Sequence, residues 1–350
     1  MDLQTPKQAG AVAVKPKLKP NPKAPRQVLP VMTPEARVQG AEEVALGFNA
    51  DQVRIEALRC LQCKDPVCVQ ACPLHIDIKS FISLMAQGEF EAAYQKISEE
   101  SPFPGICGRV CQHELFCEKS CLLGKKLEPV AIGSLERFAA DKNRELKLAA
   151  AAPAAATAAV DSPPQPQGAR VALIGSGPAS LIAAYDLVRH GYRVTVFEAL
   201  HQLGGVLAYG IPNFRLPREI IHDEINRLAA MGVEFRKSVI VGKTFTVEEL
   251  LAEGFEAVFL GTGAGLPHLM GIPGENLVGV YTANEFLTRL NLMEAFKFPA
   301  TDTPVHIGKH TVVVGGGNSA MDAARWARRM GSETTILFRR GRAELRARLE

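Results

Sequence analysis

Eight cysteines in two runs are the residues whose spacing says most about chemistry. The runs are Cys60-x2-Cys63-x4-Cys68-x3-Cys72-Pro73 and Cys107-x3-Cys111-x5-Cys117-x3-Cys121. Neither run has the paired C-x2-C spacing of a zinc ribbon. Closely spaced thiolates that end in Cys-Pro are typical of iron–sulfur ligation, in which the fourth cysteine of a run often serves the other cluster. We therefore predict iron–sulfur binding, with zinc or unligated thiols as the alternatives. A bound cluster that only stabilises a small domain, with no redox role, is a further alternative.

A first glycine-rich segment predicts a dinucleotide site. Between a predicted strand over 171–174 and a predicted helix over 178–190 the chain reads Gly175-Ser176-Gly177-Pro178-Ala179-Ser180. The first two glycines permit a tight turn and close approach of the backbone to a pyrophosphate, whose charge the helix N-terminus stabilises. Glu198 closes the next strand, over 193–197, about twenty residues on, where an acid accepts the ribose hydroxyls. Ser180 departs from the usual Gly or Ala, which affects local fit only.

A second glycine-rich segment follows the same pattern with a different ending. It reads Gly315-Gly316-Gly317-Asn318-Ser319-Ala320, between a predicted strand over 311–314 and a predicted helix over 318–330. The returning strand over 334–338 is followed by Arg339 and Arg340, where the first unit has Glu198. Because arginine pairs with a 2′-phosphate and an acid repels it, we predict NADP(H) at the second site and a nucleotide without that phosphate at the first. The alternative is that the two arginines begin a solvated, charged stretch.

The elements that position these residues divide the chain into regions. A length of 350 residues suggests two or three domains. Around the cysteines the pattern predicts helices over 52–61, 78–86 and 90–97, whereas after residue 168 short strands, including one over 257–260, alternate with helices. We predict an α/β fold class: a disordered basic, proline-rich tail (1–48), an all-α iron–sulfur domain (49–148), an Ala/Pro linker (149–168), and two Rossmann-like domains (169–283 and 284–350). The second is expected to be incomplete, because one βαβ unit is too little for a doubly wound domain.

Charge and hydropathy exclude several classes of protein. Residues 1–30 carry a charge of +5, which leaves −2 for the rest of a chain whose total is +3. A folded part with that charge argues against nucleic-acid binding. No stretch approaches the ~20 apolar residues of a membrane span, and no signal peptide is recognisable. We expect a cytoplasmic protein whose cysteines bind metal and form no disulfides.

Together these residues resemble the glutamate synthase small-subunit family, which includes sulfide dehydrogenase-like and ferredoxin:NADP oxidoreductase-like members and shares its module with dihydropyrimidine dehydrogenases. The resemblance covers roughly residues 50–350. It rests on the cysteine runs and on the segments 106–111, 132–138, 203–212 and 214–217. It implies a pyridine nucleotide-disulfide oxidoreductase-like fold behind the helical domain.

The resemblance also implies cofactors and their ligands. One [4Fe–4S] cluster is expected on Cys60, Cys63, Cys68 and Cys121, and another on Cys72, Cys111, Cys117 and Glu136. Cys107 is then left over, although spacing alone would make it the eighth ligand; a solvated helix carboxylate is the alternative for Glu136. FAD is expected at the first nucleotide site, with contributions from Gly204, Gly205, Arg215, Gly261, Thr262 and Gly263. NADPH is expected at the second, on Gly315, Gly317, Asn318, Ser319, Arg339 and Arg340.

The function implied is that of an NADPH-dependent iron–sulfur flavoprotein that passes electrons to a partner subunit, in the family a glutamate synthase large subunit. No side chain is nominated as a general acid or base, since the cofactors carry the chemistry. Nothing in the chain resembles a glutaminase or an FMN barrel. One alternative is the NADPH-linked subunit of a sulfide dehydrogenase or a bifurcating ferredoxin:NADP oxidoreductase. Another, from a different class, is a non-catalytic iron–sulfur docking module.

Overall fold

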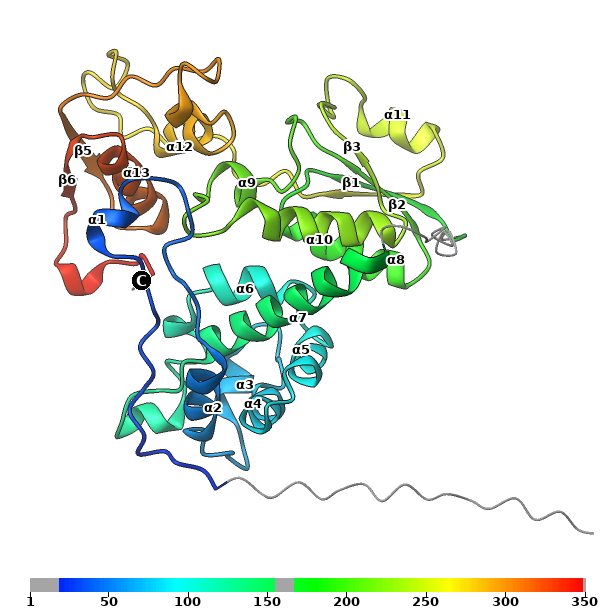
Figure 1. Cartoon of the computed structure of the whole chain (residues 1–350). Coiled ribbons are helices and arrows are strands. Elements are labelled where there is room, and N and C mark those ends of the chain that lie inside the picture. The colour runs from blue at the N-terminus through cyan, green and yellow to red at the C-terminus, as the bar shows by residue number, and fades with distance from the viewer. Residues whose placement is uncertain (1–18, 155–166, 349–350) are drawn as a thin grey trace, which may run out of the picture.

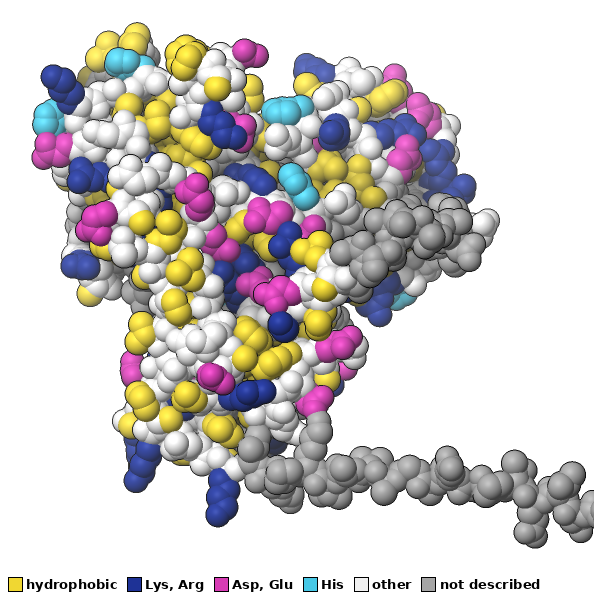
Figure 2. Space-filling view, in the orientation of Figure 1, with side chains coloured by type: hydrophobic (Ala, Val, Ile, Leu, Met, Phe, Trp, Pro, Cys, Tyr) yellow, Lys and Arg dark blue, Asp and Glu magenta, His cyan; other side chains and the backbone are white. Residues whose placement is uncertain are grey.

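The computed structural model describes residues 19–154 and 167–348, which form a helical domain and two α/β lobes (Figure 1). In Figure 1 the helical domain lies below and the lobes lie side by side above it. Figure 2 shows the lobes as separate masses on top of the helical domain. Within the described ranges, no helix has the length and apolar character needed to cross a membrane.

The helical domain is built from short helices around one core. Its elements are α2 (Ala50–Leu58), α3 (Val67–Ala71), α4 (Ile78–Gln87), α5 (Phe90–Ser98), α6 (Pro104–Val110), α7 (Ile132–Ala154) and two 3-10 turns, His113–Leu115 and Leu122–Lys125. Asn49 begins α2 through a capping box with Gln52, and Gly88 ends α4 in a left-handed conformation with φ 77°. Val53, Phe81 and Leu135 are fully buried at the centre. The predicted helices are present, although α2 ends at Leu58, three residues before the predicted end.

The long helix α7 continues beyond the predicted domain boundary. It runs to Ala154, so residues 149–154 of the predicted linker are helical, as the high helix propensity of alanine favours. The remainder of that stretch, up to residue 166, lies outside the described residues.

Residues 19–48 are not the disordered tail that composition predicted. The guanidinium of Arg26 donates to Glu118 at 2.7 Å, and the backbone N–H of Gln27 donates to the buried carboxylate of Glu56 at 2.7 Å. Farther along, the segment forms helix α1 (Pro34–Arg37) and an antiparallel bridge between Val31 and Ala45. Local composition missed this order because its partners lie 29 or more residues away in sequence. Residues 1–18 lie outside the described part of the chain.

The first lobe is a four-stranded parallel sheet in the order β3-β2-β1-β4. The strands are β1 (Arg170–Ile174), β2 (Arg193–Phe197), β3 (Glu234–Arg236) and β4 (Ala257–Leu260). Helices α8 (Pro178–Arg189) and α10 (Arg218–Ala230) cover the face toward the helical domain, with α9 (Val206–Tyr209) beside them (Figure 1). On the other face α11 (Val247–Ala252) buries Leu250 against Ala172 and Phe197. Ile106 of α6 joins the core formed by α8 and α10, so the lobe packs directly on the helical domain.

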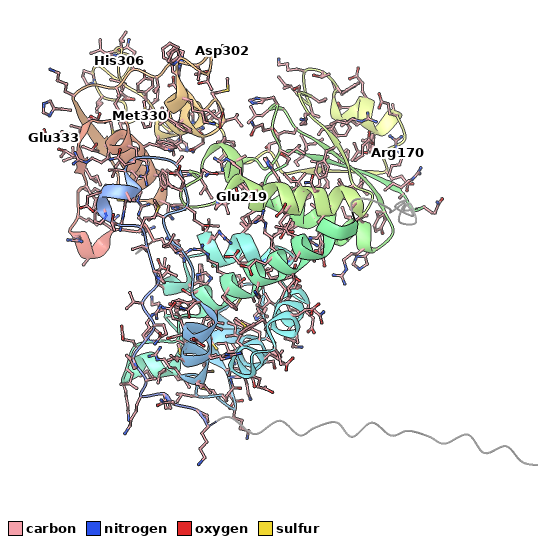
Figure 3. All side chains as sticks on the ribbon, in the orientation of Figure 1. Arg170, Glu219, Asp302, His306, Met330 and Glu333 are labelled. Carbon is pink, nitrogen blue, oxygen red and sulfur yellow. The ribbon has the colours of Figure 1, made fainter. Side chains whose placement is uncertain are left out.

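The second lobe contains the parallel pair β5 (His310–Val314) and β6 (Glu333–Leu337) with helices α12 (Ala283–Asn291) and α13 (Asn318–Arg329) and a 3-10 turn, Ala295–Lys297. The single tryptophan, Trp326 of α13, is 2% exposed and donates its indole N–H to Asn291 of α12 at 2.8 Å. In Figure 3, Glu333 lies at the outer edge of this lobe, whereas Glu219 of α10 lies where the lobes and the helical domain approach one another. The predicted fold class, a helical domain followed by parallel α/β units, is confirmed.

Candidate iron–sulfur and dinucleotide sites

Four cysteines line a small cavity at the end of the helical domain that lies away from the lobes. The cavity measures about 30 Å³ and its thiols are Cys60, Cys63, Cys68 and Cys121. Burial raises the pKa of the Cys60 thiol and raises that of Cys68 to about 11; the neighbouring Cys121 adds to both effects. Partly buried, mutually repelling thiols become thiolates more readily beside a bound cation, so this set fits an iron–sulfur cluster. Among the described residues no three His, Cys, Asp or Glu side chains converge as the ligands of a single ion would.

The second group of cysteines lies closer to the lobes, beside α6 and α7. Burial, and after it the charge of Glu136, raises the pKa of Cys111 to about 11. Burial also raises the pKa values of Cys107 and Cys117, and Glu136 contributes to both. Cys72 acts electrostatically on all three of these thiols. The structure therefore brings together the predicted second set, Cys72, Cys111, Cys117 and Glu136. Cys107, which the resemblance leaves out of that set, lies in the same group.

Glu136 has the surroundings of a ligand and not those of a solvated carboxylate. It is only 4% exposed, so the alternative of a solvated helix carboxylate is wrong. Its Oε2 lies 3.4 Å from Nε2 of the buried His113, and within the described residues its buried Oε1 has no hydrogen-bond partner. An unpaired buried carboxylate oxygen is costly, and a cluster iron at this position would satisfy it. His113 was not predicted from the sequence, because a lone histidine carries no spacing pattern.

Two glycines allow the close packing that places the second group. A Cβ on Gly108 of α6 would lie 2.6 Å from the backbone nitrogen of Arg137 in α7. A Cβ on Gly133, in the first turn of α7, would overlap the ring of His113. These contacts hold α6 against α7, and so hold Cys107 and Cys111 beside Glu136.

The first dinucleotide loop lies at the carboxyl ends of β1, β2 and β4. Gly175 has φ 93°, and a Cβ there would lie 2.5 Å from the carbonyl oxygen of Gly261 after β4. Gly177 precedes α8 as its N-cap; no side chain caps the helix, and a Cβ on Gly177 would meet open space. The uncapped N–H groups and the open space above them fit a pyrophosphate. Pro178 and Ala179 form the first turn of α8.

A hydrogen-bond network holds Glu198 against this loop. The Ser176 backbone N–H and hydroxyl donate to its Oε2 at 2.8 and 2.5 Å, and Leu200 N–H donates to Oε1 at 2.8 Å. Gly204 N–H in turn donates to the Ser176 hydroxyl at 2.9 Å, which draws the Gly204-Gly205 turn over the loop. The structure thus brings together the predicted residues of the first site: Gly175, Ser176, Gly177, Glu198, Gly204, Gly205, Gly261 and Thr262.

The second dinucleotide loop has the same architecture. Gly317 is the N-cap of α13, again without a capping side chain, and a Cβ on it would meet open space. Gly316 lies against the ring of Phe338, which places Arg339 and Arg340 next to the loop with both side chains exposed. The Asn318 side-chain oxygen accepts from the Arg348 N–H at 3.0 Å. Gly315 adopts φ 139°, and Ser319 is exposed in the first turn.

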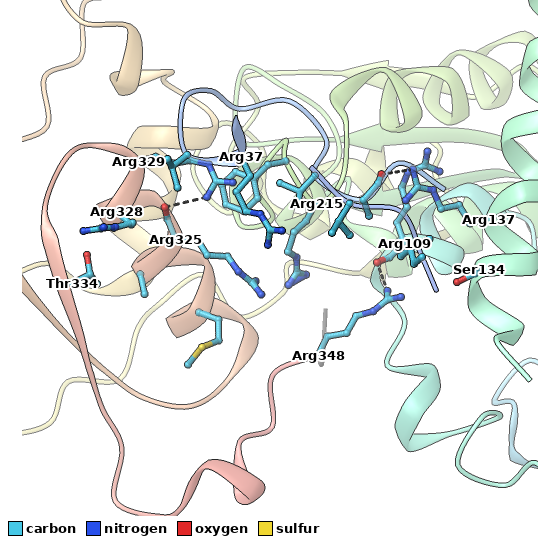
Figure 4. A pocket seen from close by; sticks show the side chains of 18 of the residues that line it. Arg37, Arg109, Ser134, Arg137, Arg215, Arg325, Arg328, Arg329, Thr334 and Arg348 are labelled. Carbon is cyan, nitrogen blue, oxygen red and sulfur yellow. Dashed lines mark hydrogen bonds between the residues drawn. The ribbon is translucent and has the colours of Figure 1, made fainter. Parts of the chain in front are cut away.

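Arg215 lies away from the first loop and in a cavity that no sequence motif predicted. The cavity measures about 450 Å³ and lies between α6, α7, α13, β6 and the N-terminal segment (Figure 4). Arginines dominate its polar lining, and Arg215 pairs there with the buried Asp322 at 3.3 Å. Burial lowers the pKa of Arg329 to about 10, and the neighbouring Arg325 and Arg37 add to this. Such a cluster is invisible in the sequence because its members come from segments far apart.

Comparison with protein families identifies the class of protein. Residues 169–349 match the model described as pyridine nucleotide-disulphide oxidoreductase, and residues 37–148 match that of dihydropyrimidine dehydrogenase domain II, 4Fe-4S cluster. Because the first match covers half of the chain, the protein belongs to the pyridine nucleotide-disulphide oxidoreductase family. An iron–sulfur domain precedes the oxidoreductase domain.

The chain is also similar to individual proteins of known name. The chain is 39% identical over 295 residues to the NADP(+)-dependent formate dehydrogenase subunit beta of Moorella thermoacetica, covering 80% of this chain and 40% of that one. It is 34% identical over 302 residues to the glutamate synthase [NADPH] small chain of Escherichia coli, covering 85% and 62%. The resemblance to the glutamate synthase small-subunit family is thereby confirmed. Among solved structures, Mycobacterium tuberculosis FprA in complex with NADPH matches with a TM-score of 0.45 and 24% identity, covering 52% and 46%. The chain spans about 40 to 65% of the length of the curated relatives it matches.

Proposed function

We propose that this chain is the NADPH-dependent electron-input part of an iron–sulfur flavoprotein oxidoreductase that serves a partner subunit. The observation that carries the proposal is one arrangement: two groups of partly buried thiols lie in a domain that packs on the first lobe, and each of the two lobes carries an uncapped dinucleotide loop. When bound, FAD supplies the exchange between a two-electron nicotinamide and one-electron clusters. Within this proposal the protein is cytoplasmic, because cysteines in that reducing compartment bind metal more readily than they form disulfides.

The metal ligands are assigned by the grouping of the thiols together with the family resemblance. We assign Cys60, Cys63, Cys68 and Cys121 to one [4Fe–4S] cluster, because these four line one cavity. The second cluster takes Cys72, Cys111, Cys117 and Glu136, with Oε1 of Glu136 as the oxygen ligand. The hydrogen bond between His113 and Oε2 orients this carboxylate. Cys107 lies among the second group, and we leave it outside both sets because the family resemblance makes Glu136 the fourth ligand; its thiol lies 4.0 Å from the Ser101 hydroxyl.

The nucleotides are assigned by the chemistry at the two loops. FAD occupies the loop of Gly175 and Gly177, where Glu198 accepts from the ribose and repels a 2′-phosphate. NADPH occupies the loop of Gly315 and Gly317, where Arg339 and Arg340 are exposed and able to pair with the 2′-phosphate. Thr262 and Gly263 follow β4 beside the first loop, and a Cβ on Gly263 would meet open space.

The identity of the partner is the finer part of the proposal. The relatives carry names of different complexes, a glutamate synthase, a formate dehydrogenase and an NADPH-Fe(3+) oxidoreductase. We therefore propose a common input module whose acceptor subunit differs between complexes. A glutamate synthase large subunit is one such acceptor; the subunits of a sulfide dehydrogenase or a bifurcating ferredoxin:NADP oxidoreductase are others.

An anaerobic absorbance spectrum before and after NADPH tests the proposal, with iron, zinc and flavin quantified in the same sample. About eight irons per chain, bound FAD and bleaching by NADPH are expected, since each [4Fe–4S] cluster holds four irons. Zinc in place of iron would contradict the assignment of the cysteines. Iron and flavin that NADPH fails to bleach would favour the non-catalytic docking module.

A further inference from the structure

The first cysteine group opens onto a strongly basic part of the surface. Six lysines lie on the segments that carry these cysteines or that contact them: Lys23, Lys64, Lys79, Lys119, Lys125 and Lys126. We call this set the lysine face. Lys79 lines the cysteine cavity itself, and Lys64 directly follows Cys63. Lys125 ends the 3-10 turn that begins after Cys121.

The lysines of the lysine face form no ion pairs with described residues, and five of the six are exposed. Four acidic side chains lie within two residues of these lysines in sequence, Asp65, Asp77, Glu118 and Glu128, and of these Glu118 is buried and paired with Arg26. Three other described lysines do form ion pairs with carboxylates, among them Lys96 with Glu99 at 2.6 Å. A concentration of unpaired charge of one sign attracts ligands of the other sign.

Apolar side chains lie among these lysines. Leu61, one residue after Cys60, is 44% exposed, and Leu127, one residue after Lys126, is 46% exposed. Exposed leucines beside the cysteine cavity supply the apolar centre that a protein interface needs, with the lysines as its charged rim. In Figure 2 basic side chains project from the lower end of the helical domain, which the lobes leave uncovered.

The position of the lysine face matches the exit of an electron path. The second cysteine group lies beside α6, which packs on α10 of the first lobe, whereas the first group lies beside α2 and α3 at the opposite end (Figure 1). An electron that enters from the lobes therefore reaches the second group before the first. We propose that the lysine face is the docking site for an acidic partner protein that carries a one-electron centre. A cluster held by Cys60, Cys63, Cys68 and Cys121 would supply one electron there, which the partner's centre would gain, with no proton moved.

This inference rests on the proposed function, and the test separates the two. The holoenzyme is assayed with NADPH and three acceptors: an acidic ferredoxin, a basic cytochrome c and the small neutral quinone menadione. The test variant is Lys64→Glu/Lys125→Glu, and the matched control is Lys243→Glu/Lys309→Glu, which reverses two exposed lysines on the lobes. Iron and flavin content confirm that each variant is loaded.

Electrostatic steering predicts the outcome. The test variant should reduce ferredoxin at least about tenfold more slowly than wild type at low salt, since steering changes association rates by ~10–10³. Menadione reduction should stay within about twofold, cytochrome c reduction should not fall, and added salt should slow wild-type ferredoxin reduction. The milder variant Lys64→Gln/Lys125→Gln should reduce ferredoxin at a rate between those of wild type and the test variant. Equal ferredoxin rates in the test and control variants would overturn the docking site, whereas a wild-type enzyme that reduces no acceptor would overturn the proposed function.

Discussion

The crossing of α6 and α7 allows a sharp test of how the second cysteine group is held in place. Gly108 and Gly105 lie one turn apart on α6, and we compare Gly108→Ala with Gly105→Ala. A Cβ on Gly108 would lie 2.6 to 2.8 Å from the N, Cα and Cβ of Arg137, and backbone atoms cannot rotate away. A Cβ on Gly105 would lie 3.4 Å from Ile220 and 3.7 Å from Ala140, which are ordinary contacts.

The magnitude follows from that comparison. Both substitutions replace glycine by alanine within a helix, so the gain of ~1 kcal/mol in helix propensity is shared and cancels. What remains is overpacking at Gly108, which costs about 1–3 kcal/mol. We therefore expect Gly108→Ala to be less stable than Gly105→Ala by about 1–3 kcal/mol.

Hydrogen exchange of the amides in α6 and α7 measures this difference, because it reports the free energy of local opening. Gly108→Ala should also lose iron faster to a chelator, because α6 leads directly into the proposed ligand Cys111. Equal protection of α6 in the two variants would show that the close approach of the helices is not what holds them together. Faster iron loss in Gly105→Ala would refute the reasoning in the same way.

Further predictions concern substitutions at four side chains. Glu136→Ala should change the low-temperature EPR spectrum of one reduced cluster and leave the other unchanged, and His113→Ala should shift the same spectrum without removing the cluster, because His113 only orients the carboxylate. Glu198→Gln should weaken FAD binding about tenfold in a flavin titration, since a hydrogen bond to a charged group contributes roughly 1.5–3 kcal/mol. Asp77→Ala should destabilise the protein by about 1 kcal/mol at pH 7 by removing the N-cap of α4. Burial raises the pKa of Asp77, but hydrogen bonds from Ser80 and the charge of Lys96 outweigh it and lower the pKa overall.

Each of these predictions has an opposing result. An unchanged EPR spectrum in Glu136→Ala would exclude the carboxylate as a ligand. Unchanged flavin affinity in Glu198→Gln would place the ribose elsewhere. Because the folded-state pKa of Asp77 is depressed, its contribution is present above the usual carboxyl pKa and is lost as the pH falls through the folded value. The stability difference between wild type and Asp77→Ala should therefore shrink in acid, and a difference that grew in acid would contradict the assignment.

The parts of the structure that could be predicted are those whose cause is local in sequence. The strand, glycine turn and helix around Gly175 and Gly315 follow from neighbouring residues, and the structure reproduces their bounds within a residue or two. The grouping of the cysteines came from resemblance, because spacing alone could not separate Cys107 from the ligands. The order of residues 19–48 depends on Glu56 and Glu118, and no local pattern points to either. His113 and the arginine cavity were missed for the same reason.

The N-terminal segment has a consequence for the rate of electron transfer. Asn21 N–H donates to the carbonyl of Leu58 in the helical domain, and Val44 N–H donates to the carbonyl of Phe214 in the first lobe. Arg329 of the second lobe donates to Gly40 between them at 3.0 Å. One stretch of chain is thus fastened to all three parts. The rate of electron tunnelling falls off exponentially with the distance between donor and acceptor. A segment that holds the three parts at a fixed separation therefore fixes this rate. Cleavage of the segment would let the separation vary, and the electron-transfer rate would vary from molecule to molecule.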